Sequence, residues 1–249
     1  MTGVEVWRDA QAMSERAVAL TLEAAREAIA ARGRFTIALT GGSSPVGAYE
    51  QLAQTSSKEA NWDKWVVFLG DDRFVPPDDD RSNYGQARRT LLSHVPIPPE
   101  NVYRVATGVA HPEAAAQAYA QTLAEVFGVP AAGPPPVFDL ILLGMGDDGH
   151  TASLFPGYPS LEVTDRWVVS SPPGTLPPPV ERVTFTFSML NAARRVLFLV
   201  TGAKKAVPVR DVLEGGANVQ DRPAAGVRPS EGTLTWLLDE AAASLLAKK

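Results

Sequence analysis

The fold is decided by the stretch Leu143–Pro156, which reads LGMGDDGHTASLFP. It continues the apolar run Phe138–Leu143, whose length and branched side chains predict a buried strand. Glycines 144, 146 and 149 then end the strand and let backbone N–H groups approach a ligand. His150 stands at the end of this glycine loop, directly after two acids and a glycine. Open α/β sheets place their chemistry at such strand ends, so we expect acid–base chemistry at His150.

Outward from this stretch, strand-like apolar runs alternate with segments of helical periodicity. The expected strands are residues 35–39, 65–69, 102–105, 138–143, 167–170, 181–187, 196–200 and 234–238. The expected helices are residues 9–32, 46–53, 84–95, 113–127, 188–194, one after 206, and 240–247 with Asp239 as its cap. A further helical turn is expected to open at His150 or Thr151. The alternation predicts a three-layer α/β/α fold with a mostly parallel, doubly wound sheet, in which residues 1–249 form a single domain.

Composition argues against several classes of protein. The 249 residues carry a net charge of −5 with no basic block, which disfavours a nucleic-acid partner. The absence of cysteine excludes disulfides and thiolate chemistry. No apolar run approaches the length of a membrane span, and residues 1–20 lack the apolar core of a signal peptide. We therefore expect a cytoplasmic protein with no membrane partner.

Four turns that follow predicted strands carry the polar chemistry of the chain. They are Gly41–Ser44, Asp71–Arg73, Gly144–His150 and Gly202–Lys205. In a parallel sheet such turns converge on one crevice, which would bring backbone N–H groups, acids, cations and one histidine together. The three histidines of the chain are far apart in sequence, so no metal site is expected.

The turn TGGSSP at residues 40–45 lies between a predicted strand and a predicted helix. Ser44 is expected to cap that helix, with Pro45 at its first position. A glycine-rich turn and a helix N-terminus together form a phosphate cradle, but a tight turn that binds nothing fits the same residues. The turn matches neither the dinucleotide fingerprint nor the P-loop. For Asp71–Arg73, a local ion pair is the alternative to a functional role.

These motifs resemble the 6-phosphogluconolactonase family over nearly the whole chain, in the expected order. The matching segments are residues 39–45, 71–76, 82–84, 144–156, 182–184 and 202–206, of which the histidine motif is the most specific. Glucosamine-6-phosphate deaminases share the fold and an Asp-Gly-His motif, but usually have Asp-Glu-Tyr where this chain has Asp71-Asp72-Arg73. This favours the lactonase. Lactonases usually have Glu at position 72, so Asp72 is left out of the expected catalytic set.

The resemblance implies hydrolysis of 6-phosphoglucono-1,5-lactone to 6-phosphogluconate, the second step of the oxidative pentose phosphate pathway, without a metal or organic cofactor. It implies catalytic roles for His150, Asp148, Asp71 and Arg73. It implies substrate or phosphate binding by Gly41, Gly42, Ser43, Ser44, Asn83, Gly149, Thr151, Arg182 and Lys205. The expected partner is a small sugar-phosphate lactone, and the expected state is a monomer, with a homodimer as the alternative.

We expect neutral His150 to take a proton from the attacking water, because the ordinary pKa of histidine, about 6.5, is near working pH. Asp148 or Asp71 would orient the imidazole or a substrate hydroxyl. Arg182 and Lys205 would supply charge to the phosphate; Lys205 is preferred over Lys204 because Ala206 follows it. Arg73 would lie near the lactone ring, or serve as a second phosphate ligand.

Two rival functions stay open. One is a sugar-phosphate isomerase or deaminase of the same fold, and the other is a sugar-phosphate sensor without catalysis. A dehydrogenase is disfavoured because the dinucleotide fingerprint is missing, and a serine esterase because no G-x-S-x-G elbow is present.

Overall fold

The computed structural model describes residues 2–247. Its main sheet has six parallel strands in the order β1-β9-β8-β5-β2-β3. They are β1 Thr2–Trp7, β2 Phe35–Leu39, β3 Trp65–Leu69, β5 Leu140–Leu143, β8 Arg195–Val200 and β9 Thr233–Asp239. A second, antiparallel sheet has the order β4-β7-β6, with β4 Asp71–Arg73, β6 Val168–Ser171 and β7 Arg182–Phe185.

The helices lie in the connections between the strands. They are α1 Ala10–Arg32, α2 Val46–Leu52, α3 Ser57–Ala60, α4 Asn83–Ala87, α5 Pro112–Phe127, α6 Phe187–Asn191 and α7 Ala206–Leu213. The longest, α1, begins where the Asp9 carboxylate accepts a hydrogen bond from the Ala12 N–H at 2.8 Å, and it ends at Gly33, whose φ is +74°. Within residues 2–247, no helix is long and apolar enough to cross a bilayer.

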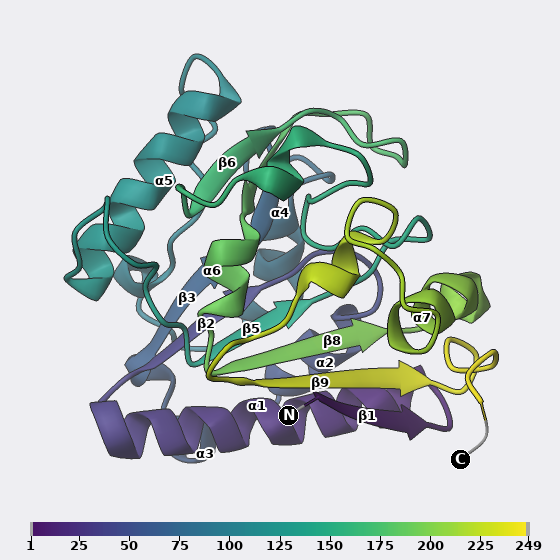
Figure 1. The fold of residues 1–249 in the computed structure, drawn as a ribbon. Coiled ribbons are helices and arrows are strands. Elements are labelled where there is room, and N and C mark those ends of the chain that lie inside the picture. Colours follow the sequence, from purple (N-terminus) through teal and green to yellow (C-terminus); the bar gives the residue numbers. More distant parts are fainter. Residues whose placement is uncertain (1, 248–249) are drawn as a thin grey trace.

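Alternating side chains of the parallel strands build a core on each face of the sheet. On β2, Ile37 and Leu39 pack into the cluster that includes α1, while Ala38 joins the cluster on the opposite face. Figure 1 shows α1 along one face, with α5, α6 and β6 on the other side of the sheet. The predicted three-layer α/β/α fold with its mostly parallel sheet is confirmed.

Gly70 connects the two sheets. Its N–H donates to the Leu39 carbonyl at the end of β2, and its own carbonyl accepts from the Phe185 N–H of β7. The chain therefore leaves β3 and enters β4 at once, so that Asp71–Arg73 form a strand rather than the expected turn. Val183 and Phe185 of the second sheet share one buried cluster with Phe198 of the main sheet. That residues 1–249 form one domain stays a prediction.

Several predicted elements are wrong. Residues 102–105 form only a single bridge, from Val102 to Val67. Residues 240–247 are turns, because the Asp239 carboxylate is shared between the Ala242 and Gly202 N–H groups and so short a segment makes a marginal helix. No helical turn opens at His150 or Thr151; residues 151–154 form a turn instead. The helix expected over 84–95 starts at residue 83 and ends at residue 92.

Candidate active site

A cavity of about 330 Å³ opens at the carboxyl edge of the parallel sheet, where the expected turns meet. It is lined by Thr40, Gly41, Gly42, Ser43, Ser44, Asp71, Arg73, Asn83, Gly144, Met145, Gly146, Asp147, His150, Ala152, Leu176, Pro177, Arg182 and Lys205. All the site residues expected from the sequence line it except Asp148, Gly149 and Thr151. The convergence occurs because β2, β3, β5 and β8 run parallel and neighbour one another, and all end at this edge.

His150 is oriented by Asp148. The Asp148 Oδ1 atom lies 2.6 Å from His150 Nδ1 and also accepts the His150 backbone N–H at 3.0 Å. Burial acts to raise the pKa of Asp148, but the hydrogen bonds from His150, and the positive charge that His150 carries when it is protonated, outweigh it, so the net pKa is below the ordinary value. An ionised carboxylate can only accept, so in the neutral imidazole Nδ1 carries the proton and Nε2 keeps its lone pair. Within residues 2–247, no group forms a hydrogen bond to Nε2.

Gly146 leaves room for this pair of side chains. A Cβ atom at position 146 would stand 2.0 Å from His150 Nδ1 and 2.5 Å from Asp148 Oδ1, so any other residue there would displace the pair. The imidazole also packs against Phe155, with ring centroids 4.7 Å apart. The glycine therefore allows the close packing of His150, and it also lines the cavity, where an approach of its backbone to a ligand stays a prediction.

Asp71 forms no hydrogen bond with His150 in the part of the chain that the structure describes. Its Oδ2 accepts a hydrogen bond from Ser153 Oγ at 2.6 Å, and Asn83 Nδ2 donates to its backbone carbonyl at 3.0 Å. Asn83 Oδ1 is buried without a hydrogen-bond partner among the residues described. A Cβ on Gly41 would lie 1.9 Å from this oxygen, so a glycine is required there. Asp71 thus anchors a polar wall, and Asp148 is the acid that orients the histidine.

Asp72 is a buried anchor for the start of α4. Its carboxylate accepts from the backbone N–H groups of Arg73, Asn83 and Tyr84 at 2.7, 2.7 and 3.1 Å, and from Ser82 Oγ at 3.2 Å. Burial raises the pKa of Asp72 to about 6, against hydrogen bonds that favour the ionised form. Its carboxylate is absent from the cavity lining.

Replacing Asp72 with alanine should lower the free energy of unfolding by about 2–4 kcal/mol, because it leaves three backbone N–H groups without an acceptor in a buried place. Urea unfolding of the purified variant measures this loss. The matched control is Asp78→Ala, which removes an exposed acid from the following loop. Equal stability of the Asp72→Ala variant and the wild type would contradict an anchoring role.

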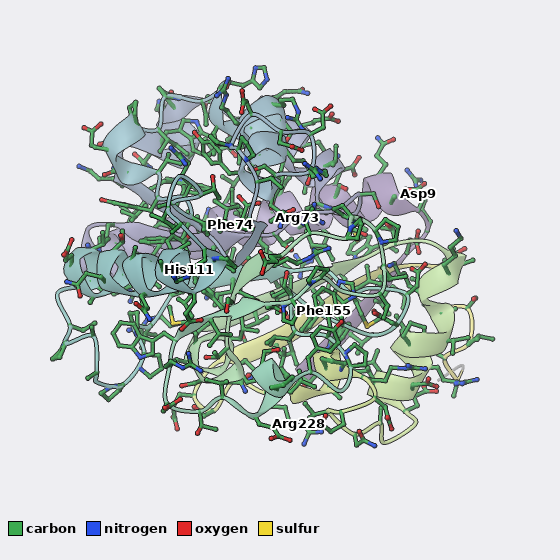
Figure 2. The ribbon with its side chains drawn as sticks, turned by 90° about the horizontal axis from the view of Figure 1, so that it is seen from above. Asp9, Arg73, Phe74, His111, Phe155 and Arg228 are labelled. Atoms are coloured by element: carbon green, nitrogen blue, oxygen red, sulfur yellow. The ribbon has the colours of Figure 1, made fainter. Side chains whose placement is uncertain are left out.

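Arg73 and Arg182 lie directly opposite each other on β4 and β7. Arg182 is only 3% exposed, and burial followed by the charge of Arg73 lowers its pKa. The Nε atoms of both arginines are buried without a partner among residues 2–247, and neither guanidinium forms a salt bridge there. Figure 2 shows Arg73 and Phe155 over the middle of the molecule; the Arg182 guanidinium lies 5.2 Å from the centre of the Phe155 ring. Two guanidiniums without a salt bridge among the described residues therefore lie in the cavity wall.

The glycine turn after β2 is held from both sides. Gln86 of α4 accepts the Gly42 N–H at 3.1 Å and donates to the Gly42 carbonyl at 2.8 Å, and the φ of Gly42 is +94°. Ser44 Oγ is bonded to Thr201 Oγ1 at 2.9 Å. The expectation that Ser44 caps the helix is wrong, because Pro45 occupies the cap position and no side chain caps α2. The turn still presents Ser43 and the glycine backbone to the cavity.

Lys205 reaches the cavity from the turn after β8. Gly202 makes this turn with a φ of +95°, and the Asp239 carboxylate accepts the Gly202 N–H at 3.0 Å. The Lys205 ammonium forms an ion pair with Asp147 Oδ1 at 2.5 Å. The cavity thus has a paired cation at the β8 end and two unpaired guanidiniums at the β4 end.

Gly149 and Thr151 lie behind the cavity wall. Gly149 has a φ of +82°, and a Cβ there would lie 2.4 Å from Arg222 Cδ. Thr151 is fully buried and its hydroxyl donates to the Gly144 carbonyl at 2.9 Å. Both residues hold the loop in shape, and direct substrate contact by either stays a prediction. Asp148 lies in the wall of a neighbouring cavity of about 620 Å³, beside Arg222.

Some residues of the site had no role assigned from the sequence. Ser153 bonds Asp71, Gln86 holds the glycine turn, and Leu176 with Pro177 closes one side of the cavity. Ser153 lies inside the histidine motif, which is the one signal that could have pointed to it. The proline-rich loop gives no signal, because its place over the cavity depends on tertiary structure.

Comparison with known proteins gives one consistent result. The family model for glucosamine-6-phosphate isomerases and 6-phosphogluconolactonases matches residues 8–236. The chain is 44% identical over 239 residues to a 6-phosphogluconolactonase of Synechocystis sp., covering 96% of each chain. It is 42% identical over 219 residues to that of Rattus norvegicus, covering 87% of this chain and 82% of the relative.

The solved structures agree. The 6-phosphogluconolactonase of Trypanosoma brucei matches with a TM-score of 0.87 at 33% identity, covering 99% of both chains. A monomeric glucosamine-6-phosphate deaminase has a TM-score of 0.81 at 22% identity, covering 98% of this chain and 99% of the other, and this likeness shows the fold alone.

Proposed function

The chain belongs to the glucosamine-6-phosphate isomerase/6-phosphogluconolactonase family, and from this membership we propose that it hydrolyses 6-phosphoglucono-1,5-lactone to 6-phosphogluconate. The reaction is the second step of the oxidative pentose phosphate pathway and makes the chain a carboxylic ester hydrolase. The observation that carries the proposal is the 2.6 Å contact of Asp148 with His150 at a cavity that also holds three cations. A cytoplasmic location and a monomeric state, with a homodimer as the alternative, stay predictions.

In the proposed reaction His150 is the general base. Asp148 keeps the proton on Nδ1, so Nε2 takes a proton from water while the water oxygen bonds to the lactone carbonyl carbon. The bond from that carbon to the ring oxygen then breaks, and the ring oxygen leaves as a hydroxyl after receiving the proton from His150. No metal or organic cofactor enters these steps, since the nucleophile and the proton both come from water.

The three cations of the cavity bind different parts of the substrate in this proposal. Lys205, Arg182, Ser43 and the backbone of the glycine turn bind the phosphoryl group, which would hold the lactone carbonyl beside His150. Arg73, on the strand opposite Arg182, stabilises the oxyanion that develops on the carbonyl oxygen. The lack of a salt bridge at either guanidinium within residues 2–247 supports this assignment, because each keeps its positive charge for an anion.

The test is a spectrophotometric assay of 6-phosphogluconolactone hydrolysis by the purified protein, read against the spontaneous reaction. Hydrolysis well above that background is expected. Release of ammonia from glucosamine 6-phosphate would instead make the chain a deaminase. Binding of the sugar phosphate without turnover of either compound would make it a sensor, and each of these two results overturns the proposal.

Replacing Lys205 or Arg182 with alanine should raise KM about tenfold or more, because a charge-assisted contact to the phosphoryl group is worth roughly 1.5–3 kcal/mol. Steady-state kinetics measure the change. Lys204→Ala is the matched control, since it removes the adjacent, exposed lysine. An unchanged KM in both variants would remove these two residues from the phosphate site.

A further inference from the structure

The ion pair between Lys205 and Asp147 is a contact of the cavity to which the proposed reaction assigns no role. Lys205 Nζ lies 2.5 Å from Asp147 Oδ1, and both side chains line the cavity. The Asp147 side chain is 42% exposed and that of Lys205 is 21% exposed. The proposed phosphate ligand therefore already holds an anion when the cavity has no ligand.

A bound phosphoryl group and the Asp147 carboxylate would compete for the same Lys205 ammonium group. A carboxylate that stayed within a few ångströms of the bound phosphoryl would repel it, since like charges at that distance oppose each other inside a cavity. The phosphoryl group carries a charge of about −1.5 to −2 near neutral pH, against −1 for the carboxylate. Lys205 therefore attracts the phosphoryl group more strongly than it attracts Asp147.

The loop around Asp147 permits this exchange without moving His150. Gly146 N–H donates to the His150 carbonyl at 2.8 Å, and Gly149 N–H donates to the Gly146 carbonyl at 3.0 Å, so the backbone is closed on itself. Lys205 is also fixed, because its N–H donates to the Gly202 carbonyl at 3.0 Å. The Asp147 side chain is exposed enough to turn towards solvent while both backbones stay in place.

We propose that Asp147 is a specificity-determining residue, an internal counter-ion that occupies Lys205 in the free protein and is displaced by the phosphoryl group of the substrate. Asp147 lowers the affinity for phosphorylated ligands, and it keeps Lys205 paired when a ligand lacks the phosphoryl group. The inference rests on the proposed function in one respect, the assignment of Lys205 as a phosphate ligand.

The test is the binding of 6-phosphogluconate, measured by calorimetry, to the wild type and to Asp147→Asn, Lys205→Ala and the double variant. Asp147→Asn should bind about two- to fivefold more tightly, the range expected when a partly exposed ion pair no longer competes. In the Lys205→Ala background the same change should have no effect. Gluconate, which lacks the phosphoryl group, should show no gain. In lactone hydrolysis, the effect of Asp147→Asn should fall on KM.

The control is Asp63→Asn, which removes the same charge from an exposed ion pair with Lys64 at 3.2 Å. Unchanged or weaker binding by Asp147→Asn would overturn the inference and make Asp147 a residue that positions Lys205. A gain that persists without Lys205 would overturn it as well. If Lys205→Ala binds 6-phosphogluconate like the wild type, the assignment of Lys205 as a phosphate ligand fails, and so does the inference. If the protein binds as expected but does not hydrolyse the lactone, only the proposed function fails.

Discussion

Replacing His150 with alanine is expected to lower kcat for lactone hydrolysis about 10²–10⁴-fold, the usual contribution of a positioned general base. The physical reason is the loss of Nε2, the acceptor that Asp148 keeps unprotonated. Hydrolysis of 6-phosphogluconolactone, corrected for the spontaneous reaction, measures the change. KM should move much less than kcat, because the phosphoryl ligands are left in place.

The variant should fold normally, since the side chain of His150 lies at the cavity wall and is 18% exposed. Thermal unfolding checks this. His111→Ala is the matched control, because His111 caps α5 and lies well away from Arg73 and Phe155 in Figure 2. Turnover close to that of the wild type in the His150→Ala variant would remove His150 from the base role.

The parts of the fold that could be predicted are those whose signal is local. Phe138–Leu143 predicts a strand because a short apolar run between polar turns has no other good place than a buried sheet. β1 was missed because it is an edge strand: Val4 and Val6 are 45% and 50% exposed, and the run has no buried alternation. β4 was missed because Asp71–Arg73 has no apolar residue, and its pairing with β7 is decided by tertiary contacts.

The same distinction applies to the site. The turns at the strand ends were predictable, because parallel strands bring their carboxyl ends to one edge. Which acid orients His150 was not, since Asp71 and Asp148 both follow strands in the sequence. In the structure, the turn at residues 146–150 brings the Asp148 carboxylate to His150 Nδ1. The Asp71 carboxylate instead accepts a hydrogen bond from Ser153. Likewise, the pairing of Lys205 with Asp147 depends on the adjacency of β5 and β8.

Replacing Asp148 with asparagine is expected to lower kcat about 10²–10⁴-fold with His150 still present, an effect comparable to loss of the base. The carboxylate can only accept, so it requires Nδ1 to carry the proton. An amide can turn its NH₂ group towards Nδ1 and so favour the tautomer with the proton on Nε2, which cannot accept a proton from water. Asp221→Asn is the control, because Asp221 and Asp148 both line the neighbouring cavity of about 620 Å³ and the change removes the same charge. Near wild-type kcat for Asp148→Asn would show that the orientation of His150 is fixed by other contacts.

The difference in free energy of unfolding between the wild type and this variant should depend on pH in a defined direction. The pKa of Asp148 in the folded protein lies below its ordinary value, so the unfolded chain binds this proton more readily than the native one. Asp148 therefore contributes stability above about pH 4, the ordinary pKa of aspartate, and loses that contribution as the pH falls through the lower native pKa. The wild type should exceed Asp148→Asn in free energy of unfolding at pH 7, and urea titrations should show the gap narrowing below about pH 4. A gap that stayed constant down to pH 3 would mean that the hydrogen bonds, rather than the charge, of Asp148 matter to the fold, and the loss of turnover would then be assigned to tautomer selection alone.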